Sequence, residues 1–260
     1  MVNPRETDAV ILVGGRGTRL RPLTVNTPKP MLPTANYPFL QHLLARIRAA
    51  GITHVVLGTS FRAEVFEEYF GDGSDLGLEI EYVVEEEALG TGGAIRNVYD
   101  KLRHDTVMVF NGDVLGDTDL TAILDTHERK EADLTMHLVR VADPRAFGCV
   151  PTDEEGQVLE FLEKTEDPPT DQINAGCYVF RRELIGEIPA GRVVSVERES
   201  FPKFLADGKR VFGHVDVSYW RDMGRPDDFV HGSSDLVRGV AHSPLLAGRT
   251  GEAIVDETAG

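Results

Sequence analysis

A basic, glycine-rich stretch lies near the start of this acidic chain. The chain carries 43 aspartates and glutamates and a formal net charge of -16, yet residues 9–63 contain no acid. The same stretch holds these cations: Arg16, Arg19, Arg21, Lys29, Arg46, Arg48 and Arg62. Glycines expose backbone N–H groups and arginines add charge-assisted donors, so residues 14–29 predict a polyphosphate site. The alternative is a tight turn with solvated basic side chains.

The glycine pattern differs from two common phosphate-binding motifs. Gly15 and Gly17 lack the third glycine of the dinucleotide fingerprint, and no acid lies about twenty positions on to hold a ribose. The Walker A pattern is also absent. The sequence therefore predicts neither nicotinamide cofactor binding nor P-loop hydrolysis.

The segments of unusual composition each follow a predicted strand. Short β-branched runs predict strands at 9–13, 54–58, 79–84 and 107–110, and helical spacing lies between them, as in 39–50. This alternation is typical of right-handed βαβ units and a mainly parallel sheet with helices on both faces. Ligands of such sheets bind at the carboxyl ends of the strands, where we expect three loops to converge: 14–29, 85–93 and 111–113.

The second half of the chain has a different pattern. Closely spaced strands are expected at 134–141, 147–152, 157–163 and 173–180. We interpret them as a smaller mixed or antiparallel extension that forms the second wall of a cleft. A final helix is expected at 226–237.

Length and composition limit the class of protein. A chain of 260 residues with 41% hydrophobic content can bury a full core, as one large α/β domain or two closely joined lobes. No apolar run approaches the roughly twenty residues of a membrane span, and no signal peptide is recognised, so a cytoplasmic protein is predicted. The excess of acidic over basic residues argues against a nucleic acid partner, because phosphate backbones are bound by extended basic surfaces. Cys149 and Cys177 are too few for a disulfide framework.

Ordered motifs along nearly the whole chain resemble those of the sugar-phosphate nucleotidyltransferases, also called nucleotide-sugar pyrophosphorylases. They are GGRGTRL at 14–20, PKPM at 28–31, LGTGG at 89–93, FNGD at 110–113, FLEK at 161–164, NAG at 174–176 and WRDMG at 220–224. Such a set is far more specific than any one motif. The resemblance implies a Rossmann-like α/β fold with a smaller sugar-binding extension.

The resemblance also implies which residues carry out catalysis. A phosphate oxygen of the sugar phosphate would attack the nucleotide. That oxygen is already largely ionised at neutral pH, so no general base is required. Arg19 would hold the triphosphate, Lys29 would reach the phosphate under attack, and Asp113 and Asp222 would hold Mg²⁺. Two plainer interpretations stay open: a hairpin turn at 111–113, and an ordinary turn or helix cap at Asp222.

The remaining site residues also follow from the resemblance. Those expected to bind the nucleotide are Val13, Gly14, Gly15, Gly17, Thr18, Glu85, Gly90, Thr91 and Asn111. A carboxylate at Glu85 suits guanine, which presents an N1–H and an amino group together, although Glu85, Glu86 and Glu87 also fit a solvated acidic face. Those expected to bind the sugar phosphate are Gly148, Glu163, Lys164 and Asn174. Glu163 and Lys164 also fit an exposed ion pair.

The resemblance is closest to family members that join mannose 1-phosphate to GTP. Transfer of thymidylyl or uridylyl groups to glucose 1-phosphate is one alternative, and a catalytically silent regulatory subunit is another. We expect a catalytic domain at 1–240, with a nucleotide-binding lobe at 1–131 and a sugar-phosphate-binding lobe at 132–225. A tail at 241–260 lacks the hexapeptide repeats that many relatives carry, which leaves homo-oligomer formation open.

Overall fold

The fold is built on a seven-stranded mixed sheet with the strand order β10-β8-β9-β6-β1-β4-β5. The computed structural model describes residues 3–15, 17–162 and 164–248. The strands are β1 (Thr7–Leu12), β4 (His54–Thr59), β5 (Glu79–Val84), β6 (Thr106–Asn111), β8 (Leu134–Arg140), β9 (Gln172–Arg181) and β10 (Val211–Asp216). Strand β9 runs antiparallel to both of its neighbours, whereas the other neighbouring pairs are parallel. The predicted fold class is confirmed.

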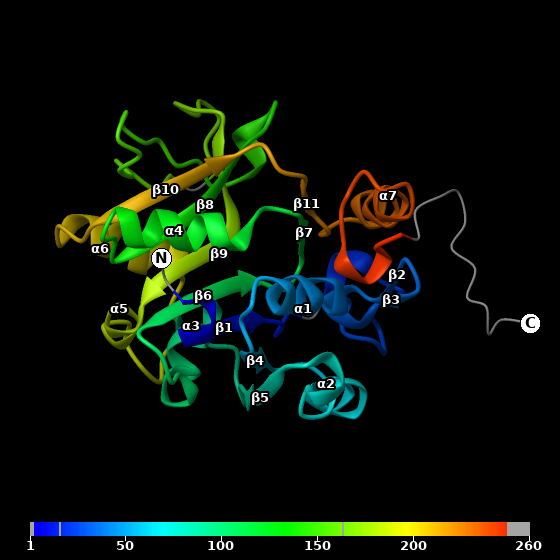
Figure 1. Cartoon of the computed structure of the whole chain (residues 1–260). Helices are drawn as coiled ribbons and strands as arrows, with labels where there is room; N and C mark the ends of the chain where they lie inside the picture. Colours follow the sequence, from blue (N-terminus) through cyan, green and yellow to red (C-terminus); the bar gives the residue numbers. More distant parts are fainter. Residues whose placement is uncertain (1–2, 16, 163, 249–260) are drawn as a thin grey trace, which may run out of the picture.

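Helices cover both faces of this sheet because its central strands are apolar on both sides. One face packs against α1 (Phe39–Ala49), α2 (Ala63–Phe70) and α4 (Leu120–Arg129). The opposite face packs against α3 (Gly90–Asn97), α5 (Arg182–Gly186) and α6 (Phe201–Ala206). Figure 1 shows α1 and α2 beside β1 and β4. Among the described residues, no helix is long and apolar enough to cross a membrane.

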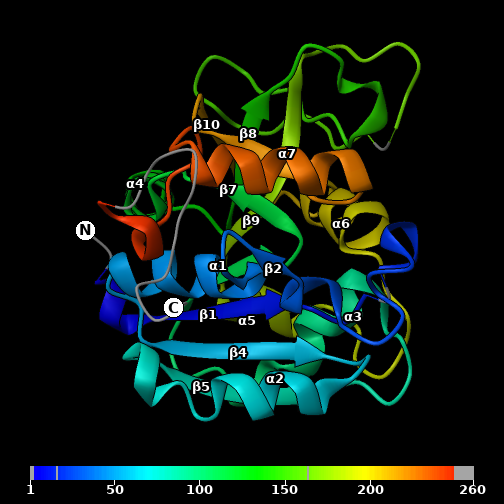
Figure 2. The same ribbon diagram turned by 90° about the vertical axis from the view of Figure 1, so that its right-hand side faces the viewer.

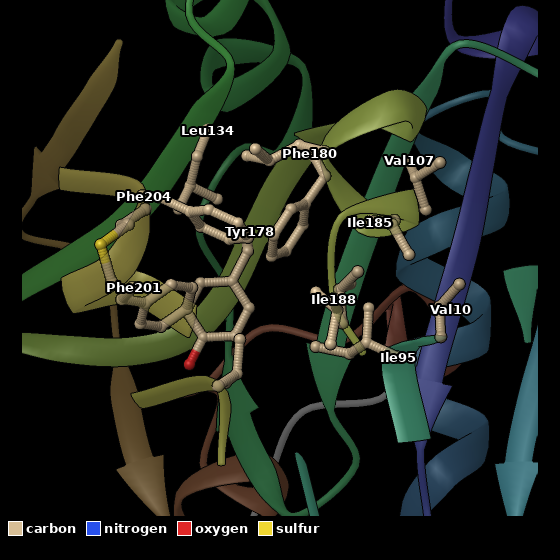
Figure 3. Packing of buried hydrophobic residues seen from close by; sticks show 14 of the residues in the cluster. Val10, Ile95, Val107, Leu134, Tyr178, Phe180, Ile185, Ile188, Phe201 and Phe204 are labelled. Carbon is tan, nitrogen blue, oxygen red and sulfur yellow. The ribbon is translucent and has the colours of Figure 1, made fainter. Parts of the chain in front are cut away.

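Aromatic side chains fill the core beneath the second half of the sheet. Tyr178 and Phe180 on β9 pack against Phe201 at the start of α6, with ring centroids 5.1 Å and 6.4 Å from it. Phe204 and Leu134 complete the group, as Figure 3 shows. All these side chains are fully buried, so β8 and β9 form one continuous core with the parallel part of the sheet.

Two of the expected strands in the second half are not formed. Residues 147–152 and 157–162 make only isolated bridges, such as Cys149 with Leu162 and Thr152 with Val158. Pro151 has no N–H to donate, and a turn at 154–155 follows almost at once, so a longer ladder cannot develop. The other two expected strands of this half join the main sheet as β8 and β9.

Small elements complete the structure around the sheet. Strand β7 (Val114–Gly116) pairs antiparallel with β11 (Trp220–Asp222), and β2 (Pro33–Thr34) pairs with β3 (Tyr37–Pro38). Helix α7 spans Pro226–Val237 as predicted. The remaining short turns are 3-10 helices at Pro4–Glu6, Thr18–Leu20, Lys29–Met31, Ser74–Leu76, Tyr99–Lys101, Pro144–Ala146 and Pro244–Leu246, and a π-helical turn at Val196–Ser200. After α7, Leu246 is buried beside Phe39, so this segment packs on α1.

A buried charged network closes the amino-terminal edge of the sheet. Asp8 on β1 is completely buried, and its Oδ1 accepts from Nδ1 of His54 and from Nδ1 of His104, both at 2.7 Å. Nε2 of His54 lies 3.2 Å from Oε1 of Glu81, so both ring nitrogens face carboxylates. Burial alone would raise the pKa of Asp8, but hydrogen bonds from His54, His104 and Arg103 lower it to about 2.

This network predicts that the protein loses stability at alkaline pH. Burial lowers the pKa of His54, but its bonds to Asp8 and Glu81 outweigh burial and raise it above the ordinary value. A raised folded-state pKa gives stability that is complete below about pH 6.5 and is lost as the pH rises through the folded value. We expect the free energy of unfolding in urea to fall as the pH rises above about 6.5, and to fall less in His54→Gln. Equal pH slopes for the two proteins would contradict this role for His54.

Candidate active site

A cleft of ≈ 510 Å³ opens at the carboxyl ends of β1, β4 and β6. Figure 2 shows β1 and β4 running side by side toward this edge. The three loops that sequence analysis placed there line the cleft together. The predicted catalytic and nucleotide-binding residues among its walls are Val13, Gly14, Gly15, Gly17, Thr18, Arg19, Lys29, Glu85, Gly90, Thr91, Asn111 and Asp113. The volume suits a nucleotide-sized ligand.

Hydroxyl groups fix the shape of the glycine-rich loop. The Thr24 hydroxyl donates to the carbonyl of Gly17 at 2.7 Å, and the Ser60 hydroxyl donates to the carbonyl of Gly14. Gly17 has a φ of 56°, and a Cβ there would lie 3.0 Å from Thr24 and 3.1 Å from Lys29, so a side chain would be strained and crowded. The carbonyl oxygens of Gly14 and Gly17 therefore accept hydrogen bonds inside the protein, which lowers their repulsion of an anion in the cleft.

The segment after β6 does not form a hairpin. The N–H of Gly112 bonds to the carbonyl of Leu12 at 3.0 Å, so the chain continues alongside β1. A Cβ on Gly112 would lie 2.7 Å from that same carbonyl oxygen, which explains the glycine at this position. Asp113 then leads into β7, which pairs with β11 rather than with β6. The hairpin interpretation of 111–113 is therefore wrong.

The ribbon formed by β7 and β11 brings together two aspartates that lie far apart in sequence. Asp222 pairs with Val114, and the N–H of Met223 donates to the carbonyl of Asp113 at 3.0 Å. Burial raises the pKa of Asp222, and the charge of Asp113 raises it further, while Lys29 and Arg19 lower it. The site thus contains two carboxylates: Asp113 contacts Lys29, and Asp222, which is not among the residues lining the cleft, lies within reach of the charges of Lys29 and Arg19.

Lys29 is the buried cation of this site. Its Nζ lies 3.1 Å from Oδ2 of Asp113, and its side chain is 8% exposed against 44% for Asp113. A backbone turn at Lys29–Met31 holds the stem of the side chain under the glycine-rich loop. The ammonium group is therefore held in place before any ligand arrives.

The two aspartates fit a hard divalent cation that has few protein ligands. Carboxylate oxygens are the donors Mg²⁺ prefers, and this ion usually keeps waters and substrate phosphates in its remaining positions. Within residues 3–15, 17–162 and 164–248, no group of three or more His, Cys, Asp or Glu side chains could hold a metal ion. The pair Asp113 and Asp222 therefore fits a metal completed by the phosphates of a bound nucleotide, not a metal enclosed by protein.

The amino end of α3 forms a further wall of the cleft through Gly90 and Thr91. The N–H groups of Gly92 and Gly93 donate to the carbonyl of Val194 at 2.9 Å and 3.3 Å. The hydroxyl of Thr91 donates to Oε2 of Glu197 at 2.7 Å and accepts from the N–H of Val196 at 2.9 Å. Thr91 thus lines the cleft while its hydroxyl anchors α3 to the segment before α6.

Glu85 differs from the two acids that follow it. It is half-buried in the cleft wall, whereas Glu86 and Glu87 are exposed. Burial raises the pKa of Glu85, and a 3.2 Å hydrogen bond from the N–H of Leu89 to its Oε2 opposes that shift. Of the three acids, Glu85 is therefore the one placed to meet a ligand.

The expected sugar-phosphate residues lie on the neighbouring part of the structure. The N–H of Asn174 donates to the carbonyl of Gly148 at 2.9 Å, which brings these two residues together. Lys164 is exposed on the loop after Leu162. Glu163 lies outside the described residues. The structure therefore joins Gly148 and Asn174, and it places Lys164 at the surface.

Sequence reasoning missed several residues that shape the site. Ser60 follows β4 at the same sheet edge as the other loops, so strand order alone could have indicated it. Thr24 and Glu197 act through single hydrogen bonds to a backbone carbonyl and to Thr91. Such bonds leave no pattern in a sequence.

The fold and this site define a nucleotidyltransferase. The family model described as nucleotidyl transferase matches residues 8–239, and the chain belongs to that family. The family is generally dependent on a divalent metal.

Relatives within the family are similar to this chain over nearly its whole length. Mannose-1-phosphate guanylyltransferase of Mycobacterium tuberculosis is 68% identical over 255 residues, which cover 98% of this chain and 71% of that protein. The mannose-1-phosphate guanylyltransferase catalytic subunit beta of Drosophila pseudoobscura pseudoobscura is 35% identical over 261 residues, which cover 97% of this chain and 70% of that protein. Among solved structures, HddC from Yersinia pseudotuberculosis complexed with GMP-PN has a TM-score of 0.76 at 29% identity, covering 87% of this chain and 97% of HddC.

Proposed function

We propose that this enzyme joins mannose 1-phosphate and GTP to form GDP-mannose and pyrophosphate. The arrangement of Lys29 and Asp113 in the wall of a nucleotide-sized cleft, with Asp222 beside Asp113, carries the assignment of the reaction. The 68% identity to a mannose-1-phosphate guanylyltransferase carries the assignment of the substrates. The structure of HddC with GMP-PN also favours a guanine nucleotide.

The chemistry needs positioning more than proton transfer. The second pKa of a phosphate lies near 6, so the attacking oxygen of the sugar phosphate is already largely ionised at neutral pH. That oxygen forms a bond to the α-phosphorus of GTP while the bond to pyrophosphate breaks on the opposite side. The protein supplies in-line alignment and neutralises charge on the phosphates.

Each charged residue has a place in this scheme. Arg19 and the glycine-rich loop hold the departing pyrophosphate, and Lys29 neutralises the phosphate under attack. Asp113 and Asp222 would hold Mg²⁺, which when bound supplies further positive charge to the phosphates. Gly148, Lys164 and Asn174 belong to the sugar-phosphate half of the site, within the lobe that we assign to residues 132–225. We place the reaction in the cytoplasm, where buried, unpaired thiols such as Cys149 and Cys177 stay reduced.

The base would be recognised by Glu85. A carboxylate accepts from the N1–H and the amino group of guanine together, whereas uracil and thymine present one such donor. We expect Glu85→Gln to reduce the preference for GTP over UTP by at least about tenfold in kcat/KM, because an amide offers a single acceptor oxygen. Competition assays with paired nucleotides measure this ratio. Glu87→Gln, at an exposed position, is the matched control, and an unchanged ratio in Glu85→Gln would remove Glu85 from base recognition.

Pyrophosphate release tests the proposed function. The four ribonucleoside triphosphates and dTTP are each supplied with Mg²⁺ and with either mannose 1-phosphate or glucose 1-phosphate. Fast release only with GTP and mannose 1-phosphate is expected. A different winning pair would keep the reaction and change the substrates, whereas binding without release for every pair would indicate a regulatory subunit.

A further inference from the structure

Strand β9 is irregular between Asn174 and Tyr178, two residues that lie on the same face of the sheet. Strand β8 advances from Met136 to Leu138 while its partner β9 runs from Tyr178 to Asn174, so β9 carries extra residues at this point. Gly176 within this bulge has a φ of 77°, a conformation that favours glycine. Bulges of this kind redirect side chains beside functional sites.

Two asparagines of the site lie at the hydroxyl of Tyr178. Nδ2 of Asn174 donates to it at 2.7 Å, and the Asn111 side chain lies close enough to oppose the burial that raises the pKa of this hydroxyl. Asn111 ends β6 and lines the nucleotide cleft, whereas Asn174 belongs to the predicted sugar-phosphate set. An amide from each half of the site therefore lies at this hydroxyl.

The surroundings hold this hydroxyl in one place. Tyr178 is fully buried, and its ring is fixed by Phe180 and Phe201 (Figure 3). Gly176 packs so closely on Asn111 that a Cβ there would lie 2.8 Å from Nδ2. Oδ1 of Asn174 accepts from the N–H of Gly176 at 3.0 Å. The buried hydroxyl and the two half-buried amides therefore lie together, and the aromatic core sets the position of the hydroxyl.

We propose that Tyr178 is a positioning residue that fixes Asn111 and Asn174 relative to each other, so that the nucleotide and the sugar phosphate are aligned for in-line attack. This inference rests on the proposed function, because it assigns a role within that reaction. Tyr178 touches neither substrate and acts through the two asparagines. The alignment of the two substrates thus depends on a side chain of the hydrophobic core and not on loops at the surface.

The first test is the substitution Tyr178→Phe, which keeps the ring and removes the hydroxyl. The KM for mannose 1-phosphate is expected to rise about tenfold, the effect of losing one buried hydrogen bond, because Asn174 loses its anchor. Tyr82→Phe is the matched control, since its hydroxyl donates to the carbonyl of Gly71 at 2.7 Å and lies away from the site. Thermal unfolding of each variant verifies that it is folded. Should Tyr178→Phe fold poorly, Asn174→Leu, which has a similar volume and no donor, removes the same bond from the other end.

A second test separates positioning from a general structural role. If Tyr178 acts through Asn174, adding Tyr178→Phe to Asn174→Ala changes the KM for mannose 1-phosphate by less than about twofold. Equilibrium binding of GDP-mannose to the same proteins gives a readout that needs no turnover. A full effect of Tyr178→Phe in the Asn174→Ala background, or an unchanged KM in Tyr178→Phe alone, would overturn the inference. Wild-type protein that releases no pyrophosphate with GTP and mannose 1-phosphate would instead overturn the proposed function.

Discussion

Asp113→Asn is expected to lower turnover by at least about a hundredfold and to leave the fold intact. An amide is a poorer metal ligand than a carboxylate, and the substitution also removes the negative charge that pairs with Lys29 at 3.1 Å. Asp113 is 44% exposed on the side chain, and the asparagine oxygen in its place can still accept from the buried Nζ of Lys29, so the protein stays folded. Steady-state assays over a range of Mg²⁺ concentrations, with thermal unfolding alongside, measure both effects.

The control for this experiment lies on the same ribbon. Asp117→Asn keeps an oxygen that can accept the 2.8 Å hydrogen bond from the N–H of Tyr219, so its turnover should stay within about threefold of wild type. Asp113→Asn should also need more Mg²⁺ for half-maximal rate, whereas Asp117→Asn should not. Near-normal activity of Asp113→Asn at ordinary Mg²⁺ would remove Asp113 from the metal site.

The parallel part of the fold could be predicted closely because its strands are buried on both faces. The expected strands at 54–58 and 107–110 fall within β4 and β6, whose residues are nearly all buried. The strand at 79–84 and the helix at 226–237 have the bounds found in the structure, although β5 is a partly exposed edge strand. Residues 147–152 look like a strand in composition but form only isolated bridges. Whether a short apolar run becomes a strand depends on a neighbour that can pair along its whole length, and the sequence does not specify that neighbour.

The sequence predicts which residues form the site, but not the contacts between them or their exposure. The rule that ligands bind at the carboxyl ends of strands brought three loops to one edge, and all three line the cleft. The contact between Lys29 and Asp113 spans 84 residues and depends on the pairing of β1 with β6. Likewise, only the folded structure distinguishes Glu85, which is half-buried, from Glu86 and Glu87, which are exposed.

Lys29→Met is expected to lower kcat by about a hundredfold to a thousandfold while the protein stays folded. Loss of one preorganised group that stabilises developing charge has an effect of this size. Methionine is similar in length and apolar, so it fills the buried channel that the lysine stem occupies, and the side chain of Lys29 is only 8% exposed. Rapid-quench measurement of a single turnover separates this chemical step from product release.

The same substitution distinguishes a catalytic lysine from a structural ion pair. Replacing the buried member of a merely structural pair by an apolar residue of similar volume is often neutral for stability, and it would leave turnover unchanged. Lys101→Met provides the comparison, because Lys101 pairs with Glu81 at 2.7 Å far from the cleft. We expect that variant to keep its rate, whereas Lys29→Met loses its rate at nearly constant unfolding free energy. Equal rates for the two variants would show that Lys29 serves only to neutralise Asp113, and the positive charge on the phosphate under attack would then have to come from elsewhere in the site.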